Sequence, residues 1–335
     1  MLEPSLRTMG WFMRYRRLGS AGPKVSAIGL GCLAMTGGLG AADEAECVAT
    51  VRKGLDAGLN LLDTADFYSD GANEELVGRA IVGRRDGVVL ATRGGLRPEH
   101  PGGPPKILDG RPGSLRTACE ASLRRLGVDH IDLYYLGRVD PKVPVEESVG
   151  GLGDLVAQGK IRYVGLSEAA PADIVRAHTV HPITALQTEY SLWERHVEER
   201  ILPLTRKLGI GFVAHTPLGK GFLTGTLTSA EQLGDGDIRR NHPRFLGENF
   251  DRNSSLVAEA ARVMASTGIP LPQLALAWLL SRGEDVVAIP GTRRAGHLMT
   301  NLAAADVPMS EALAGQLASM ISHEQVAGSR APVRR

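Results

Sequence analysis

The 335-residue chain is poor in cysteine, in aromatic residues and in net charge. Its three cysteines, Cys32, Cys47 and Cys119, lie far apart and form neither a CxxC motif nor a disulfide framework. This usage is typical of a reducing compartment, so we expect a cytoplasmic protein. The formal net charge of +1 leaves no excess of Lys and Arg to neutralise nucleic acid or an anionic membrane.

Long apolar runs are absent as well. No stretch of about 18 apolar residues occurs, and the first dozen residues lack the apolar core of a signal peptide. We find no HExxH motif, no histidine grouping with metal-ligand spacing, and no sequence repeat of about 20–50 residues. We therefore expect no metal, no nucleic-acid partner and no membrane association, in a protein that is a monomer or a weak homo-oligomer.

What the chain does contain is a regular alternation of short apolar runs, polar loops and amphipathic segments. The short runs lie at 27–32, 59–63, 88–92, 131–136, 161–166, 184–187, 211–214 and 286–289. Each is too short for a buried helix and several are rich in β-branched residues, which indicates strands. About eight strands alternating with helices predict a parallel sheet closed into a (β/α)8 TIM barrel; the strand count alone leaves an open, doubly wound sheet as an alternative.

The segments between the runs have helical faces and end signals. Apolar residues from 115 to 126 recur at helical spacing, and Gly127 follows where a left-handed residue ends a helix. A second stripe, from 149 to 156, is closed by Gly159. Asn73, followed by two glutamates, is the predicted N-cap of another helix.

We expect one barrel domain over 13–325, between a flexible N-terminal extension (1–12) and a flexible basic tail (326–335). Residues 13–27 read as a β-hairpin that plugs the barrel floor. Two long loops, 94–111 and 216–253, follow strand ends and should overhang the C-terminal mouth, where the active sites of such barrels lie.

Polar residues stand just after the predicted strands, where the barrel would bring them together. Asp63 would be a buried carboxylate, and Arg93, after the next strand, is a candidate partner for its charge. Tyr68 lies in the loop after Asp63, and a nearby cation can make a phenol a usable general acid for reducing a carbonyl. Spacing alone leaves a second interpretation equally open, in which Tyr68 is a surface residue and Asp63–Arg93 an ordinary ion pair.

The ordered motifs of the chain resemble those of the aldo-keto reductases, which are NADP(H)-dependent (β/α)8 oxidoreductases. The similarity runs from Tyr15 to about Asp306. The matching segments are VSAIGLGCLAM, LNLLDTADFYSDGANEELVGRAI, VVLATRGG, IDLYYLGRVDP, GKIRYVGLSEA, LQTEYSLWER, TPLGKGFLTG and VVAIPGTRR. The IPGTRR segment is similar to that of the bacterial and plant branch of the family.

The resemblance implies a catalytic tetrad of Asp, Tyr, Lys and His, of which two positions differ here. Asp63 and Tyr68 match the family, but Arg93 stands at the lysine position and Gly137 at the histidine position. Arginine keeps the positive charge and can bind Asp63 with two prongs, yet it does not give up a proton. Gly137 removes a hydrogen-bond donor aimed at the substrate carbonyl, a loss of ~10²–10³ in kcat. Arg138 and Trp193 are expected beside Gly137 in the substrate pocket.

The resemblance also implies a site for NADPH or NADP+. Ser167, Glu168 and Gln187 would hold the nicotinamide carboxamide, His215 would stack on the nicotinamide ring, and Leu218, Gly219 and Lys220 would lie along the pyrophosphate. Gly291, Thr292, Arg293, His297 and Asn301 would contact the adenosine and its 2′-phosphate. An arginine fork suits a phosphate, which favours NADP(H) over NAD(H).

Glycine at 137 is expected to open space for a bulky substrate or an ordered water. The sequence therefore predicts an NADP(H)-dependent oxidoreductase that reduces a carbonyl, or a related C=N or C=C group, of an unusual and bulky small molecule with Tyr68 as general acid. A redox-neutral enzyme using the same pocket, or a cofactor-binding regulatory or partner protein of low activity, are the alternatives. On this basis the Arg93→Lys, Gly137→His double change should recover far more activity than Arg93→Lys alone.

Overall fold

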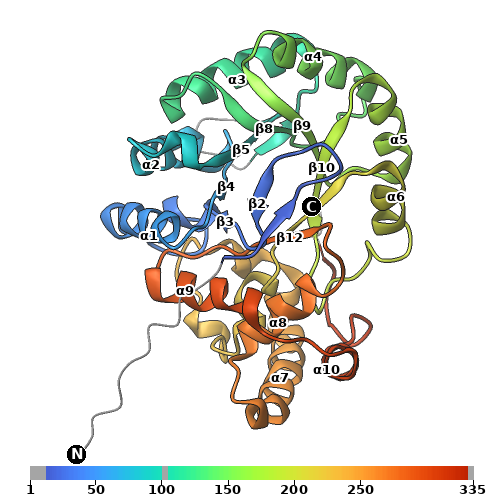
Figure 1. Ribbon diagram of the computed structural model, residues 1–335. Helices are drawn as coiled ribbons and strands as arrows, with labels where there is room; N and C mark the ends of the chain where they lie inside the picture. The colour runs from blue at the N-terminus through green and yellow to red at the C-terminus, as the bar shows by residue number, and fades with distance from the viewer. Residues whose placement is uncertain (1–12, 100–104, 331–335) are drawn as a thin grey trace, which may run out of the picture.

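Eight strands in the described part of the chain form one closed parallel barrel (Figure 1). The computed structural model describes residues 13–99 and 105–330. The eight strands of the main sheet are β3 (Leu30–Gly31), β4 (Leu61–Asp63), β5 (Val89–Gly94), β8 (Ile131–Leu136), β9 (Ile161–Ser167), β10 (Ile183–Glu189), β11 (Gly211–His215) and β12 (Val286–Ile289). Parallel bridges from Ile28 to Ala288 and from Gly31 to Gly291 join the first strand to the last. The predicted (β/α)8 barrel is confirmed, and the open sheet is excluded.

Helices surround the barrel (Figure 1). They are α1 (Glu44–Asp56), α2 (Ala72–Ile81), α3 (Pro112–Leu126), α4 (Val145–Ala157), α5 (Pro171–Val180), α6 (Ile201–Leu208), α7 (Gly247–Met264), α8 (Leu271–Leu280), α9 (Ala295–Ala303) and α10 (Glu311–Met320). Short 3-10 helices lie at Leu33–Thr36, Tyr68–Gly71, Arg85–Gly87, Gly219–Thr224, Ala230–Gln232, Ile238–Asn241, Pro243–Phe245, Ala265–Thr267 and Ala304–Asp306. Gly127 has a φ of 66° and ends α3 as predicted.

The predicted N-cap of α2 is wrong. Gly71, with a φ of 91°, precedes the helix, and Asn73 lies inside its first turn. The side chain of Asn73 is fully buried: it accepts a hydrogen bond from the Thr64 hydroxyl at 2.7 Å and donates to the Cys32 carbonyl at 2.8 Å. The Asn73 side chain therefore bonds to Thr64 and Cys32 and does not cap the helix. These bonds hold α2 against the strand ends at the barrel mouth.

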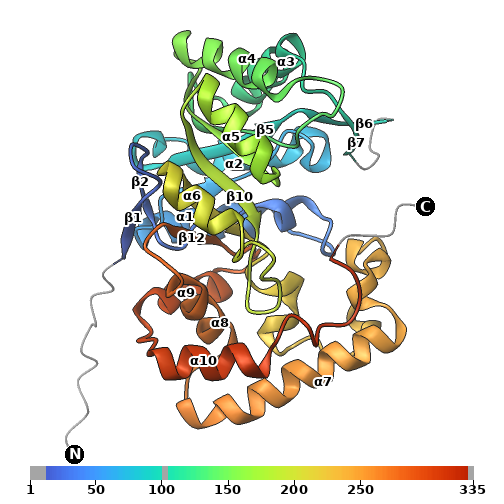
Figure 2. The ribbon, with the colours of Figure 1, turned by 90° about the vertical axis from the view of Figure 1, so that its right-hand side faces the viewer.

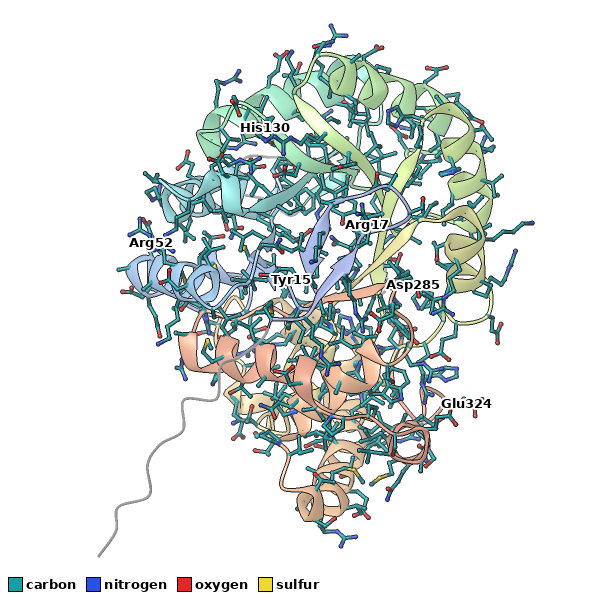
Figure 3. The ribbon with its side chains drawn as sticks, in the orientation of Figure 1. Tyr15, Arg17, Arg52, His130, Asp285 and Glu324 are labelled. Atoms are coloured by element: carbon teal, nitrogen blue, oxygen red, sulfur yellow. The ribbon has the colours of Figure 1, made fainter. Side chains whose placement is uncertain are left out.

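The N-terminal hairpin closes the amino end of the barrel. β1 (Tyr15–Arg17) and β2 (Lys24–Ser26) pair antiparallel, as predicted, and Figure 3 shows Tyr15 and Arg17 on this hairpin in front of the barrel strands. Leu18 and Val25 are fully buried against the side chains that fill the barrel interior. Burial of two such side chains stabilises the fold by ~1.5–3 kcal/mol each.

The two long loops lie at the other end, as predicted. Figure 2 shows β6 (Leu96–Pro98) and β7 (Pro105–Leu108), an antiparallel hairpin within the first loop, on the side of the molecule opposite β1 and β2. The second loop, between β11 and α7, is built mainly of 3-10 turns. These loops bring side chains far apart in sequence to the carboxyl ends of the strands.

The predicted flexible tail is corrected in part. The amide of Ala327 donates to Asn253 Oδ1 at 2.9 Å, and His242 Nε2 lies 2.8 Å from the carbonyl oxygen of Arg330. Residues 327–330 are thus held against α7 and the second loop because their backbone groups find partners there. Residues 1–12 and 331–335, also predicted to be flexible, lie outside the described residues.

Within the described part of the chain, no single helix is long and apolar enough to cross a membrane. Only the pair Gly247–Thr267 and Leu271–Leu280, bent by 88°, meets that requirement by length and composition.

Candidate active site

Three buried side chains form a closed hydrogen-bonded triangle at the carboxyl ends of β4, β5 and β10. Arg93 Nη2 is bonded to Asp63 Oδ1, and Arg93 Nη1 donates to Gln187 Oε1 at 2.5 Å. Gln187 Nε2 donates to Asp63 Oδ2 at 2.7 Å. Asp63 and Arg93 are only 3% and 4% exposed, so the ion pair is shielded from solvent. The predicted ion pair between Asp63 and Arg93 is confirmed, and Gln187 bonds to both residues.

Burial raises the pKa of Asp63, and the Arg93 charge and the Gln187 amide offset this only in part. The sequence placed Gln187 at a strand end but gave no sign that it would bind Asp63 and Arg93. That contact depends on the barrel, which brings β10 opposite β4 and β5.

Tyr68 begins a tight turn directly beside this triangle. The next two residues, Ser69 and Asp70, have left-handed backbone angles, with φ of 49° and 52°. The Arg93 guanidinium carbon lies 5.9 Å from the centroid of the Tyr68 ring. Burial raises the pKa of Tyr68, while the charges of Arg93 and Arg138 work in the opposite direction. The phenol is therefore protonated at neutral pH, and it is not the isolated surface tyrosine of the alternative interpretation.

The space expected beside Gly137 is filled. A Cβ at this position would lie 2.5 Å from Leu96 Cδ1 and 2.9 Å from the backbone oxygen of Gly94. The Gly137 amide donates to that same oxygen at 2.8 Å, which fixes the backbone. The prediction of open volume is wrong because the β6–β7 hairpin places Leu96 there. The expectation of a bulky substrate, and that of recovery by Gly137→His, lose their basis.

Arg138 follows Gly137 and reaches across the end of the next strand. Its Nη1 donates to the Gly137 carbonyl at 2.7 Å and to the Ser167 hydroxyl at 3.0 Å. Its side chain is partly buried, and desolvation lowers its pKa.

Glu168 belongs to an ion network at the barrel mouth. His215 Nε2 lies 2.7 Å from Glu168 Oε1, and Arg330 Nη2 is bonded to the same oxygen. Arg330 also donates through Nε to Glu189 Oε2 at 2.8 Å. Burial opposes ionisation, but His215 and Arg330 hold the pKa of Glu168 well below its ordinary value. The sequence missed Arg330, because the tail carries no pattern that would place it here.

Leu218, Gly219 and Lys220 lie together at the start of the second long loop. Lys220 has a φ of 54°, and burial lowers its pKa. Its ammonium group is 3.9 Å from Glu189 Oε1. Trp193 is 1% exposed, packs on Phe222 and lies beneath Gly219, so the prediction that it lines the substrate pocket is corrected to a place in the core.

The remaining predicted cofactor residues lie just before α9 and within it. Gly291 bridges to Gly31, and the Thr50 hydroxyl donates to the Arg293 carbonyl at 2.9 Å. The Arg293 guanidinium is bonded to the Ala41 carbonyl. Within α9 itself, His297 is exposed, Asn301 is buried, and no side chain caps the helix N-terminus.

Sequence reasoning also missed Asp66, between Asp63 and Tyr68. Its Oδ1 is buried and has no hydrogen-bond partner among the described residues. Burial, with the nearby charge of Glu74, raises the pKa of Asp66 to about 8. Nothing in the loop sequence distinguishes this carboxyl from a solvated one.

No group of His, Cys, Asp or Glu in the described ranges 13–99 and 105–330 could hold a metal ion. The three cysteines are free and buried.

Comparisons with known proteins extend over nearly the whole barrel. The model of the Aldo/keto reductase family matches residues 27–321. A probable aldo-keto reductase 1 of Glycine max is 42% identical over 316 residues, which are 94% of this chain and 90% of the relative. The glycerol dehydrogenase of Gluconobacter oxydans has a TM-score of 0.84 at 29% identity, covering 96% of this chain and 98% of its own. An aldo/keto reductase of Klebsiella pneumoniae, solved with NADP and acetate, has a TM-score of 0.70 at 30% identity over 96% and 99% of the two chains.

Proposed function

Because this chain belongs to the aldo/keto reductase family, we propose that it is an NADP(H)-dependent enzyme that reduces the carbonyl group of a small molecule, with Tyr68 as the general acid. The observation that carries this proposal is the position of Tyr68 against the buried Asp63–Arg93–Gln187 triangle. The NADP in the solved Klebsiella pneumoniae relative supports the choice of cofactor.

Tyr68 holds the proton that the carbonyl oxygen takes up. Because burial raises the pKa of Tyr68, the proton is in place at neutral pH, whereas oxidation of an alcohol would require the phenolate. Arg93, 5.9 Å from the ring centroid, stabilises the negative charge that forms on Tyr68 as the proton leaves. Asp63 and Gln187 hold Arg93 in that position. At neutral pH these residues therefore hold Tyr68 in the protonated form that reduction of a carbonyl uses.

The residues at the start of α9 fit the phosphate of a dinucleotide. The N–H groups of the first turn have no side-chain cap, and such a helix start attracts anions. Arg293 and Arg294 add guanidinium groups that would distinguish a 2′-phosphate from a hydroxyl. The buried Lys220 would neutralise the pyrophosphate. When bound, NADPH supplies the hydride that the carbonyl carbon accepts.

Two of the predicted carboxamide ligands, Ser167 and Gln187, have hydrogen-bonding capacity left, whereas Glu168 Oε1 already has three partners. Ser167 accepts from Arg138 but keeps its own hydroxyl hydrogen, and Gln187 uses one of its two amide hydrogens for Asp63. We therefore assign the carboxamide to Ser167 and Gln187. Glu168 serves as the ion partner of His215 and Arg330, which orients the imidazole at the position predicted to stack on the nicotinamide.

Fluorescence titration with NADPH and NADH, followed by turnover of aldehydes, ketones and enones, tests this proposal. We expect NADPH to bind more tightly than NADH by ~10- to 100-fold, since charge-assisted bonds to a phosphate contribute about that much. Arg293→Gln should weaken NADPH and leave NADH unchanged, so that NADH is the internal control. Absence of binding by either nucleotide, or binding without reduction of any carbonyl, would contradict the proposal.

A cofactor-binding protein of low turnover is the second candidate. The observation that favours it is the glycine at position 137, which offers no side-chain donor and where even a Cβ would lie 2.5 Å from Leu96 Cδ1. This candidate predicts NADPH binding together with a residual turnover that Tyr68→Phe does not change.

A further inference from the structure

The guanidinium of Arg138 differs from those of Arg93, Arg244 and Arg330, the other arginines that lie around Glu168, Glu189 and Asp63. Its Nη1 is bonded to the Gly137 carbonyl and the Ser167 hydroxyl, both uncharged. No ion pair and no bond through Nη2 or Nε joins Arg138 to any residue in the described ranges. Two of its donor atoms are therefore available.

The neighbouring cations are already neutralised. Arg93 pairs with Asp63, Arg244 with Glu194, and Arg330 with both Glu168 and Glu189. Glu168 is the acid whose charge acts most strongly on Arg138, but its carboxylate is bound by His215 and Arg330. Arg138 is thus the one cation without a carboxylate partner in this described cluster.

An unpaired guanidinium that is partly removed from water is unfavourable unless a bound anion compensates for the lost solvation. Desolvation is the largest influence on Arg138, and it lowers the pKa of a group that is ordinarily fully charged. The planar fork of arginine matches a carboxylate in two-pronged geometry.

The electrostatic surroundings place this fork near the reacting end of the site. The charge of Arg138 acts on Tyr68, and Tyr68 and Arg93 act in turn on Arg138. Ser167, which Arg138 contacts, is one of the two residues assigned to the nicotinamide carboxamide. An anion bound by Arg138 would therefore lie beside Ser167, at the end of the cofactor site where we expect the substrate.

We propose that Arg138 is a specificity-determining residue that binds the carboxylate of the substrate, so that the enzyme reduces aldehydes or ketones that also carry an acid group. This inference rests on the proposed reductase function. The reaction would convert an oxo acid to the hydroxy acid: hydride from NADPH forms the new C–H bond, Tyr68 gives its proton to the oxygen, and NADP+ is released. The carboxylate itself is unchanged.

The test compares 4-carboxybenzaldehyde with 4-formylbenzamide, which have the same shape but differ in charge. We expect the wild type to prefer the acid in kcat/KM. Arg138→Gln should lower kcat/KM for the acid by ~10- to 100-fold more than for the amide, with the difference mainly in KM. For Arg138→Lys, kcat/KM for the acid should lie between the values of the wild type and of Arg138→Gln, because lysine keeps the charge but lacks the planar guanidinium. Arg162→Gln, an equal change in charge at the amino end of β9, is the matched control.

Calorimetry provides a readout without turnover. With NADP+ present, benzoate, which has no alcohol for NADP+ to oxidise, should bind the wild type and the Arg162→Gln variant alike, and Arg138→Gln should bind it ~10-fold or more weakly. If neither aldehyde is reduced, the proposed function fails, and calorimetry alone decides the role of Arg138. Three results for Arg138→Gln would overturn the inference while leaving the reductase proposal intact. They are equal losses of kcat/KM for the acid and the amide, a loss of NADPH affinity, and carboxylate binding as tight as in the wild type.

Discussion

Introducing a side chain at position 137 should destabilise the protein through close contacts with the Leu96 side chain and the Gly94 backbone. In Gly137→Ala the new Cβ would lie 2.5 Å from Leu96 Cδ1 and 2.9 Å from the Gly94 oxygen, both shorter than van der Waals contact. Overpacking of this kind costs about 1–3 kcal/mol. Leu96→Ala removes the nearer of the two atoms, whereas the backbone oxygen stays. The double variant should therefore be more stable than the sum of the single changes by about 1 kcal/mol.

Urea unfolding of the wild type, the two single variants and the double variant measures this coupling. The same clash predicts that Gly137→His alone does not raise activity, and that Leu96→Ala is needed before a histidine can be placed there. Additivity within ~0.5 kcal/mol would show that Leu96 does not occupy the position, and it would refute our reason for the loss of the family's histidine.

Two further predictions concern buried charges. Arg93→Met should lower the free energy of unfolding by about 3–5 kcal/mol, because it leaves Asp63 charged and unpaired, and adding Asp63→Asn should recover much of this loss. Urea unfolding measures both variants, and a double variant that is no more stable than Arg93→Met would contradict the prediction. The pKa of Asp66 is about 8 in the folded state, above the ordinary value of about 3.9. Between these two values the folded state keeps a proton on Asp66 that the unfolded state has lost, so the free energy of unfolding falls as the pH rises from 4 towards 8. Asp66→Asn should remove this slope and be more stable than the wild type at pH 8 by ~1 kcal/mol or more, while equal pH slopes for the two proteins would contradict the assignment.

The barrel could be predicted from the sequence because its strands and helices carry local patterns. The runs at 131–136 and 286–289 match β8 and β12 in full, and Gly127 ends α3 where its backbone angle requires it. Asp63 and Arg93 could be paired because both end neighbouring strands and a buried carboxylate needs a partner.

The contacts that the sequence did not reveal depend on loops. Leu96 reaches Gly137 only because the β6–β7 hairpin folds over the mouth, and Arg330 reaches Glu168 because the tail returns across the second loop. Asn73 has a typical capping side chain, but tertiary bonds to Thr64 and Cys32 outweigh that local preference. Side-chain contacts between segments so distant in sequence leave no periodic signal in either segment.

The rate of NADPH oxidation after rapid mixing with an aldehyde, compared between the wild type and Tyr68→Phe, tests most directly whether Tyr68 is the proton donor. The account predicts a loss of ~10²–10⁴ in the rate constant with NADPH affinity unchanged, and a wild-type rate that stays level from about pH 6 to 9, because the pKa of Tyr68 is raised. Tyr15→Phe, on the hairpin at the opposite end of the barrel, should react like the wild type. A Tyr68→Phe rate within about threefold of the wild type would contradict the account.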